Sequence, residues 1–387
     1  MTYLDYNATT PADQRVDRAA QVWHVEKFGN ASSRDHAWGW DASEVAEDYR
    51  RAVAESVDGG SSEVTFTSGA TESLNTAIKG FVGYTGWARK KIVTCATEHD
   101  AVLTPCRRLQ RSTGIEVEIL PIDRQGNLNL DEFKTAMCSD KEILVSVMAA
   151  NNEIGNIHPV REMSRIAHGV GALFLCDLAQ AVGKMPIDVR TDGIDLAAFS
   201  AHKLYGPKGV GALFIRGGEP EIKLEPLIVG GGHERGLRAG TLNVPGIVGF
   251  GEACRIAMLE MAEDSARIGK LRDKLESALL AELPDIWING DQNHRLCNTS
   301  NIGFRGVDAR TLIRDMHDIA VSTRSACSSG DPGPSHVLKA IGLTDDEAYS
   351  CIRFSLGRFT TEEEIDYTIG KVITSVRKLR RSKNVTA

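Results

Sequence analysis

Short apolar runs alternate with longer stretches of helical periodicity between about residue 60 and residue 230. Each run is a few residues long and is bounded by polar or glycine-containing segments, as expected of strands buried in a parallel sheet. This alternation predicts an α/β fold, in which helices flank a mostly parallel sheet. The runs that we interpret as strands are Glu63–Phe66, Lys91–Thr94, Ile115–Leu120, Ile143–Val147, Ala172–Leu175, Ile194–Phe199 and Val210–Ile215.

The pattern changes beyond residue 250. A long helical stretch comes first, followed by shorter strands and helices, and the chain closes with a capping box at 361–364 and a last helix. We therefore expect a large domain over residues 15–250 and a smaller α+β domain made of residues 1–14 and 251–387. The apolar positions of the two long helices are Leu259, Ile268, Leu271, Leu275 and Leu279 in the first, and Ile365, Ile369, Val372, Val376 and Leu379 in the last.

Composition and charge narrow the class of protein. With 387 residues, 42% hydrophobic and 25% charged, the chain can bury a large core. A net charge of -7 argues against direct nucleic-acid binding or attachment to an anionic membrane over the whole surface. No apolar run is long enough to span a bilayer, and the opening segment lacks the regions of a signal peptide, so we expect a cytoplasmic protein. The eight cysteines are scattered without a CxxC pair, which predicts neither a disulfide framework nor a metal site.

Polar residues gather just after the apolar runs. Lys203 lies in FSAHKLYGPKG, between a strand-like run and a turn, and Ser200 and His202 beside it are hydrogen-bonding groups. Because ligands bind at the carboxyl ends of parallel strands, such residues are expected to meet at one edge of the sheet. The other segments of this kind are Thr67–Ser73, Thr97–His99, Asn151–Gly155 and Asp177 with Gln180.

Together these segments suit one cofactor. Small residues before a helix at 67–73 provide backbone N–H groups for a phosphate. Pyridoxal phosphate also requires a lysine for a Schiff base and a carboxylate that keeps its pyridine nitrogen protonated, which Lys203 and Asp177 can supply. The pattern therefore predicts pyridoxal phosphate chemistry on an amino acid.

The same segments resemble a known family. LDYNATTP, FGNASS, FTSGATES, TEHDAVL, NNEIG, DLAQAVGK, SAHKLYGPKG, GGGHERGLRAGT, RSACSSG and IRFSLGRFTTEEEIDYT are similar to the NifS/IscS class of cysteine desulfurases, in order and from end to end. The resemblance implies the fold of type I pyridoxal phosphate enzymes and a homodimer. It also implies transfer of sulfur from L-cysteine to a cysteine of the enzyme, which leaves alanine.

The resemblance also implies roles for individual residues. Lys203 would form the Schiff base, Asp177 would pair with the pyridine nitrogen, and His99 would stack on the ring and assist proton transfers. Arg353 would bind the substrate carboxylate, and its place in an alternating strand-like segment supports this independently. The other cofactor contacts implied are Gln180 and Asn151 at the phenolic oxygen, and Ala70, Thr71, Ser200, His202 and the partner subunit's Thr241 at the phosphate.

Cys327 differs from the other cysteines in its context. It lies among small residues, glycines and prolines in SACSSGDPGP, which is typical of an exposed loop, and Arg324 nearby favours a thiolate. The resemblance implies that Cys327 accepts the sulfur, because the family's acceptor cysteine lies in the matching SAC segment. The sequence departs from the family's usual residues at Thr323-Arg324, where a change in the loop and in acceptor docking is expected. It also departs at Asp100 and Ala201, and neither of these two departures removes a catalytic group.

Several alternatives stay open at this point. A selenocysteine lyase would share the cofactor chemistry but depend less on Cys327, and a type I aminotransferase would have no use for a sulfur-accepting loop. A non-enzymatic reading is a sulfur-carrying or iron-sulfur scaffold, with a transient cluster at Cys327. The destination of the sulfur is also open, since similar enzymes serve iron-sulfur assembly, tRNA thiolation and DNA phosphorothioation. A sulfur-acceptor protein is the expected partner.

Overall fold

The computed structural model describes residues 1–84, 86–324 and 333–386. The strands are β1 (Thr2–Tyr3), β2 (Val64–Thr67), β3 (Lys90–Cys95), β4 (Glu116–Leu120), β5 (Glu142–Ser146), β6 (Leu173–Asp177), β7 (Leu196–Ser200), β8 (Gly211–Ile215), β9 (Ile286–Asn289), β10 (Thr299–Phe304), β11 (Ile319–Ala320) and β12 (Cys351–Ser355). The helices are α1 (Gln14–Val25), α2 (Ala37–Glu55), α3 (Ala70–Gly83), α4 (Asp100–Thr113), α5 (Leu130–Ala136), α6 (Val160–His168), α7 (Val244–Glu282), α8 (Ala309–Asp315), α9 (His336–Ala340), α10 (Asp345–Ala348) and α11 (Glu362–Thr386). Three short 3-10 turns are η1 (Ser61–Glu63), η2 (Ala201–Lys203) and η3 (His233–Gly236).

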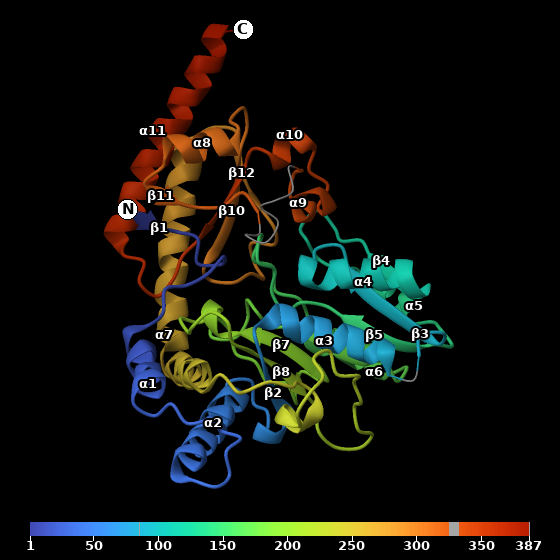
Figure 1. Cartoon of the computed structure of the whole chain (residues 1–387). Helices are drawn as coiled ribbons and strands as arrows, with labels where there is room; N and C mark the ends of the chain where they lie inside the picture. The colour runs from blue at the N-terminus through green and yellow to red at the C-terminus, as the bar shows by residue number, and fades with distance from the viewer. Residues whose placement is uncertain (85, 325–332, 387) are drawn as a thin grey trace.

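A large mixed sheet forms the centre of the molecule (Figure 1). Its strand order is β2-β8-β7-β6-β5-β3-β4, with β4, β3, β5, β6 and β7 parallel and β8 antiparallel to both of its neighbours. Every run interpreted as a strand between residues 60 and 230 lies in this sheet, which confirms the predicted α/β fold.

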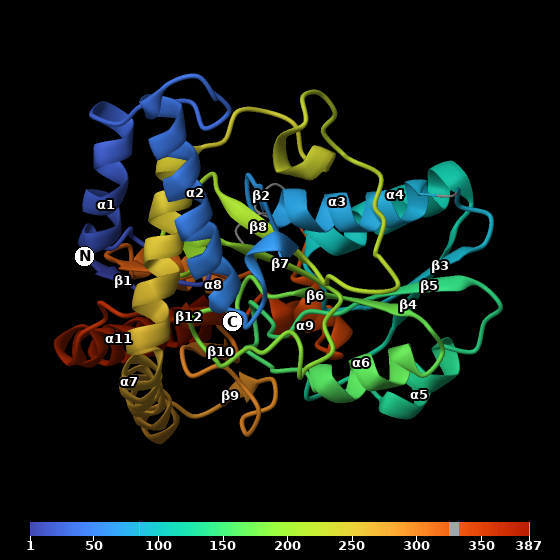
Figure 2. The ribbon, with the colours of Figure 1, turned by 90° about the horizontal axis from the view of Figure 1, so that it is seen from below.

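Helices cover both faces of the sheet, as Figure 2 shows for α3 and α4 on one side and α5 and α6 on the other. The side-chain alternation of β7 explains this arrangement. Leu196 and Ala198 pack in the core under α3 and α4, whereas Ala197 and Phe199 pack in the core that α2, α5, α6 and the start of α7 share. Because both faces are buried, the strands are apolar throughout.

A second core lies around the antiparallel sheet β12-β10-β9. The helix α7 runs from the first core to the second, so the predicted boundary at residues 250 and 251 falls inside one helix. The division of the chain into these two domains stays a prediction. The second core also contains Leu4 from the N-terminal segment.

The apolar positions of α7 do not all lie on its buried face. Ile268, Leu271, Leu275 and Leu279 are buried in the second core, but Leu259 is 85% exposed. At about 100° per residue, Leu259 lies about 180° around the helix from Ile268, so the two side chains leave opposite faces.

The last helix, α11, begins with the predicted capping box. Thr361 N donates to Glu364 Oε2 (3.0 Å), and Glu364 N donates to Thr361 Oγ1 (3.2 Å). Its apolar face packs on α7 in the second core through Ile365, Val372 and Val376. Across the described residues, we find no helix with the length and apolar character needed to cross a membrane.

Candidate active site

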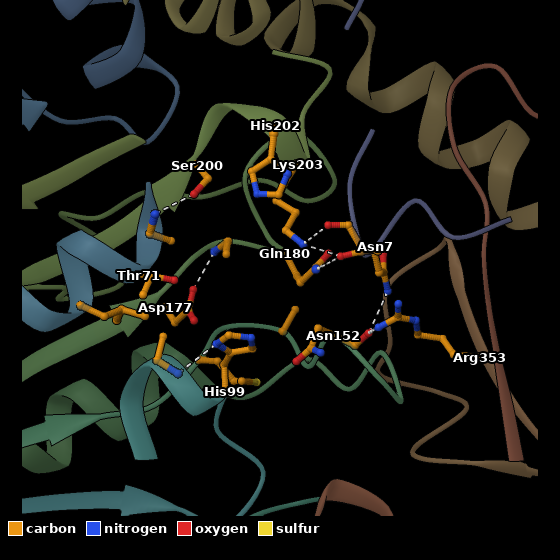
Figure 3. Close-up of a pocket in the computed structure, with 17 residues that line it drawn as sticks. Asn7, Thr71, His99, Asn152, Asp177, Gln180, Ser200, His202, Lys203 and Arg353 are labelled. Carbon is orange, nitrogen blue, oxygen red and sulfur yellow. Dashed lines mark hydrogen bonds between the residues drawn. The ribbon is translucent and has the colours of Figure 1, made fainter. Parts of the chain in front are cut away.

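One pocket lies at the carboxyl edge of the large sheet, where that edge meets the N-terminal segment and β12. Its empty volume is about 690 Å³, including the mouth that opens to solvent. Figure 3 shows the polar side chains around it, which come from segments far apart in the sequence. The predicted site residues that line this pocket are Ala70, Thr71, His99, Asp177, Gln180, Ser200, His202, Lys203 and Arg353.

Lys203 ends the short turn η2, which follows β7. Its Nζ donates hydrogen bonds to the carbonyl oxygens of Asn7 (2.5 Å) and Ala8 (2.8 Å). Two residues further on, Tyr205 has a φ of 66°, a left-handed conformation that costs a residue with a side chain about 1–2 kcal/mol. The Tyr205 hydroxyl accepts a hydrogen bond from the backbone N–H of Arg358 (2.6 Å), which helps to hold this conformation. The backbone around the lysine is therefore fixed by contacts to distant parts of the chain.

The N-terminus of α3 forms one wall of the pocket. Gly69 precedes it with φ 152° and ψ 174°, a conformation open almost only to glycine. The backbone N–H of Ala70 donates to Ser200 Oγ (2.6 Å), which joins the helix terminus to the end of β7. First-turn N–H groups and the helix dipole favour an anion at such a terminus. Ala70, Thr71 and Ser200 thus lie together, and their phosphate-binding role stays a prediction.

His202 lies beside this wall as an uncharged group. Its Nδ1 shares a hydrogen bond with Thr9 Oγ1 (3.0 Å). Burial lowers the pKa of His202 to about 4, and the nearby ammonium groups of Lys203, Lys208 and Lys184 act in the same direction. At neutral pH the ring therefore offers a hydrogen bond rather than a positive charge.

Asp177 ends β6 inside the pocket. Its Oδ1 accepts a hydrogen bond from the N–H of Ala179 (2.8 Å). Burial raises the pKa of Asp177, although that N–H and the electrostatic interactions with His99 and Lys203 act to lower it. A further cation in the pocket would favour the ionised carboxylate.

His99 is the N-cap residue of α4 and lines the pocket from there. Its Nδ1 accepts a hydrogen bond from the backbone N–H of Ala101 (3.0 Å). Because a backbone N–H can only donate, Nδ1 is unprotonated and the proton of the neutral ring lies on Nε2. The cap therefore fixes both the position of the ring and its tautomer.

Arg353 reaches the pocket from β12. Ile352 and Phe354 point into the second core, whereas Arg353 lines the pocket, as the alternation in the sequence predicts. The arginine is 1% exposed; its Nη1 donates to Asn152 O (2.9 Å) and its Nη2 to Asp5 Oδ1 (2.6 Å). Its Nε has no hydrogen-bond partner among residues 1–84, 86–324 and 333–386.

Two described site residues, Asn151 and Thr241, do not line the pocket, and a third predicted residue is not described. Asn151 donates from Nδ2 to Thr97 O (3.0 Å), and its Oδ1 accepts from the N–H groups of Glu153 and Ile154, so the side chain organises its own turn. Thr241 is exposed outside the pocket, and Cys327 lies outside the described residues. The roles of all three stay predictions.

Asn7 was missed by the sequence reasoning, although it lines the pocket. Its carbonyl oxygen accepts hydrogen bonds from Lys203 Nζ and from Gln180 Nε2 (2.9 Å). Its Nδ2 donates to Thr299 Oγ1 (2.8 Å) and to Asn152 O (3.1 Å). The sequence feature that could have pointed to Asn7 was its segment, LDYNATTP. This segment contributed to the family resemblance, but no role was assigned to any of its residues.

Most of the described thiols are poor nucleophiles. Burial raises the pKa of Cys106, Cys254 and Cys351 to about 12, and it also raises the pKa of Cys297. A thiol that ionises only at high pH is mostly protonated near neutral pH and reacts slowly. Cys138 is the exposed thiol in the described part of the chain.

Comparison with known proteins identifies the class. The profile of the class-V aminotransferases matches residues 2–368, which is nearly the whole chain. Among solved structures, that of a NifS-like protein superposes with a TM-score of 0.89 at 38% identity, covering 96% of this chain and 98% of that one. The chain therefore belongs to the class-V aminotransferase family.

Two further similar proteins match this chain over nearly its whole length. The cysteine desulfurase IscS of Anaeromyxobacter sp. (strain Fw109-5) is 48% identical over 378 residues, which cover 98% of this chain and 93% of the relative. A solved structure of SspA in complex with cysteine has a TM-score of 0.82 at 32% identity and covers 93% of this chain and 100% of that one. These matches confirm the resemblance to the NifS/IscS class.

Proposed function

We propose that the protein is a pyridoxal-phosphate-dependent cysteine desulfurase, which converts L-cysteine to L-alanine and leaves the sulfur on Cys327. The observation that carries the proposal is a single pocket that combines a lysine amine, a buried carboxyl, a helix N-terminus and a buried arginine. The IscS relative at 48% identity supports the same activity.

The chemistry of the pocket fits the cofactor. The carboxyl of Asp177, whose pKa burial raises, would be ionised beside a protonated pyridine nitrogen. The N-terminus of α3 and Ser200 suit the phosphate, and Lys203 is the amine for the aldehyde. Gln180 and Asn151 are the proposed neighbours of the phenolic oxygen.

The chain's own residues carry the proton and binding steps. When bound, pyridoxal phosphate supplies an aldehyde that condenses with amino groups and a ring that delocalises an electron pair at Cα. Lys203 then takes the Cα proton, and His99 assists from its Nε2–H. Arg353 binds the substrate carboxylate through its Nε and one Nη, which is the strongest geometry for this pair.

Cys327 performs the sulfur transfer in this proposal. Its thiolate attacks the sulfur of the bound cysteine, so that an S–S bond forms and the Cβ–S bond breaks with its electron pair going to carbon. Protonation of that carbon gives alanine. L-cysteine and a thiol thus give L-alanine and a persulfide, and the reaction needs no external oxidant or reductant.

The protein would work as a homodimer. Phe28, Trp38 and Trp40 are 70%, 51% and 57% exposed, and a second copy would cover such aromatic side chains. In the dimer, the partner's Thr241 would reach the phosphate. We place the enzyme in the cytoplasm, where thiols remain reduced, with a sulfur-acceptor protein as its further partner.

The test of this function begins with the colour of the purified protein. We expect a yellow preparation that borohydride bleaches, and equal amounts of alanine and protein-bound sulfane sulfur from L-cysteine in a single turnover. Formation of a keto acid instead of alanine would indicate an aminotransferase. A colourless protein that carries sulfur without releasing alanine would indicate a scaffold.

Selenocysteine lyase is the remaining alternative. Comparing L-cysteine with L-selenocysteine decides it, because a lyase would prefer selenocysteine and keep its activity in the Cys327→Ser variant. The desulfurase proposal expects cysteine turnover that requires Cys327.

The substitution Arg353→Lys is expected to raise KM for L-cysteine by about 10- to 100-fold with a smaller change in kcat. Hydrogen bonds to charged groups contribute about 1.5–3 kcal/mol each, and a lysine keeps the charge but loses the forked geometry. Steady-state kinetics with alanine detection measures the effect.

Arg358→Lys is the matched control for this substitution. The side chain of Arg358 is only 9% exposed and is also paired with carboxylates, at 2.7 Å to Asp264 and 3.2 Å to Asp13, but it does not line the pocket. We expect it to lower the melting temperature while KM stays unchanged. An unchanged KM in Arg353→Lys would show that this arginine does not bind the substrate carboxylate.

A further inference from the structure

A second lysine lies next to the pocket without lining it. Lys184 follows Gly183, whose φ of 76° and close neighbours Leu204 and Ala257 leave little room for a side chain at that position. The carbonyl oxygen of Lys184 accepts a hydrogen bond from Ser265 Oγ of α7 (3.1 Å). The backbone that carries this amine is therefore fixed between the end of β6 and α7.

The amine of Lys184 contacts two residues that line the pocket. Its Nζ donates a short hydrogen bond to Gln180 Oε1 and a longer one to Asn7 Oδ1 (3.3 Å). Burial lowers the pKa of Lys184 to about 7, and the charges of Lys203 and Arg353 act in the same direction, whereas the Cys297 thiol opposes it. The amine thus interacts electrostatically with both cationic side chains of the pocket, Lys203 and Arg353.

The direction of these hydrogen bonds settles the orientation of the two amides. In its protonated form the Lys184 amine can only donate, so the oxygen of each amide faces it and the nitrogen faces away. For Gln180, the NH2 group then donates to the carbonyl oxygen of Asn7 (2.9 Å), which also binds Lys203 Nζ. For Asn7, Asn298 Nδ2 donates to the same Oδ1 (3.0 Å) and supports this orientation.

We infer that Lys184 is a positioning residue, which holds the NH2 of Gln180 as the hydrogen-bond donor that the pocket offers to the phenolic oxygen of the cofactor. The inference rests on the proposed function, because it assumes the proposed place of Gln180 beside that oxygen. Lys184 acts through Gln180 and does not touch the reacting atoms.

The inference has a spectroscopic consequence. A hydrogen-bond donor at the phenolic oxygen lowers the affinity of that oxygen for the proton of the Lys203 linkage. The proton is then lost more readily. Removing the donor therefore raises the pH at which the visible band of the holoenzyme changes. A swapped amide, with its oxygen toward the phenolic oxygen, would act in the same direction by repulsion.

The experiment is a double-mutant cycle on the holoenzyme, with the midpoint of the pH titration of the visible band as the readout. We expect Lys184→Met and Gln180→Leu each to raise the midpoint by about one pH unit, equivalent to about a tenfold change in proton affinity. The double variant should show no larger shift than either single one. Lys184→Arg keeps a donor and should stay near the wild-type midpoint.

Two outcomes would overturn the inference. An unchanged midpoint in Lys184→Met would show that the lysine does not influence the titration. Fully additive shifts in the double variant would show that the charge of Lys184 acts directly rather than through Gln180. Lys184→Leu, which also lacks a hydrogen-bond donor, replaces Lys184→Met if the latter does not fold. The wild-type colour and its alanine formation test the proposed function separately, so the two failures are distinguishable.

Discussion

Replacement of Lys203 by alanine is expected to lower kcat for alanine formation from L-cysteine by at least about 10²–10⁴-fold, the contribution of a positioned general acid–base. The Lys203 amine is held by the carbonyl oxygens of Asn7 and Ala8, just after β7, in the pocket that Asp177 also lines. Its loss removes both the proton carrier and the covalent attachment of the cofactor. Borohydride treatment followed by peptide mass analysis should therefore label residue 203 in the wild type and nothing in the variant.

Lys208→Ala is the matched control for this prediction. Lys208 lies in the same turn segment but is exposed and does not line the pocket. We expect its variant to keep cofactor, colour and turnover. A small primary amine added to Lys203→Ala should restore part of the proton transfer, which a folding defect would not allow. Retained turnover in Lys203→Ala without added amine would contradict the role.

The central sheet was predictable because its strands are buried on both faces. Such strands are continuous apolar runs, and β5 and β7 contribute alternate residues to two different cores. The same rule placed His99, Asp177 and Lys203 together, since carboxyl ends of parallel strands share one edge. Local pattern and sheet geometry sufficed for this part of the site.

The contacts across the pocket could not be predicted in this way. Asn7 comes from the N-terminal segment, and no periodicity links it to Lys203, whose amine it binds through a carbonyl oxygen. The sequence likewise gives no sign of the contacts of Lys184, because a lysine after a turn is usually exposed. Asn151 and Asn152 are adjacent residues of the same type, and only the conformation of the turn sets the direction of each side chain. The hydrogen bonds of Asn151 to Thr97 and Glu153 fix the direction of its side chain.

Replacement of Cys327 by serine is expected to abolish alanine formation, by at least about a thousandfold, while the cofactor content and the visible spectrum stay unchanged. Removal of a nucleophile alone can cost more than this, and a hydroxyl does not replace a thiolate in attack on sulfur. The unchanged spectrum is expected because each of the pocket residues proposed to bind the cofactor is retained. A single turnover with L-cysteine, followed by alanine analysis and by intact mass, measures both parts.

Cys138→Ser is the control for the loss of an exposed thiol, since Cys138 is exposed on α5's C-terminal side, away from the residues that line the pocket. This variant should form alanine at the wild-type rate and gain the mass of one sulfur atom on Cys327. The buried thiols cannot substitute, because the raised pKa of Cys106, Cys254 and Cys351 keeps them protonated. Release of alanine by Cys327→Ser at the wild-type rate would contradict the role of Cys327, because another acceptor would then take the sulfur. This result would favour a lyase that releases the sulfur directly to solution.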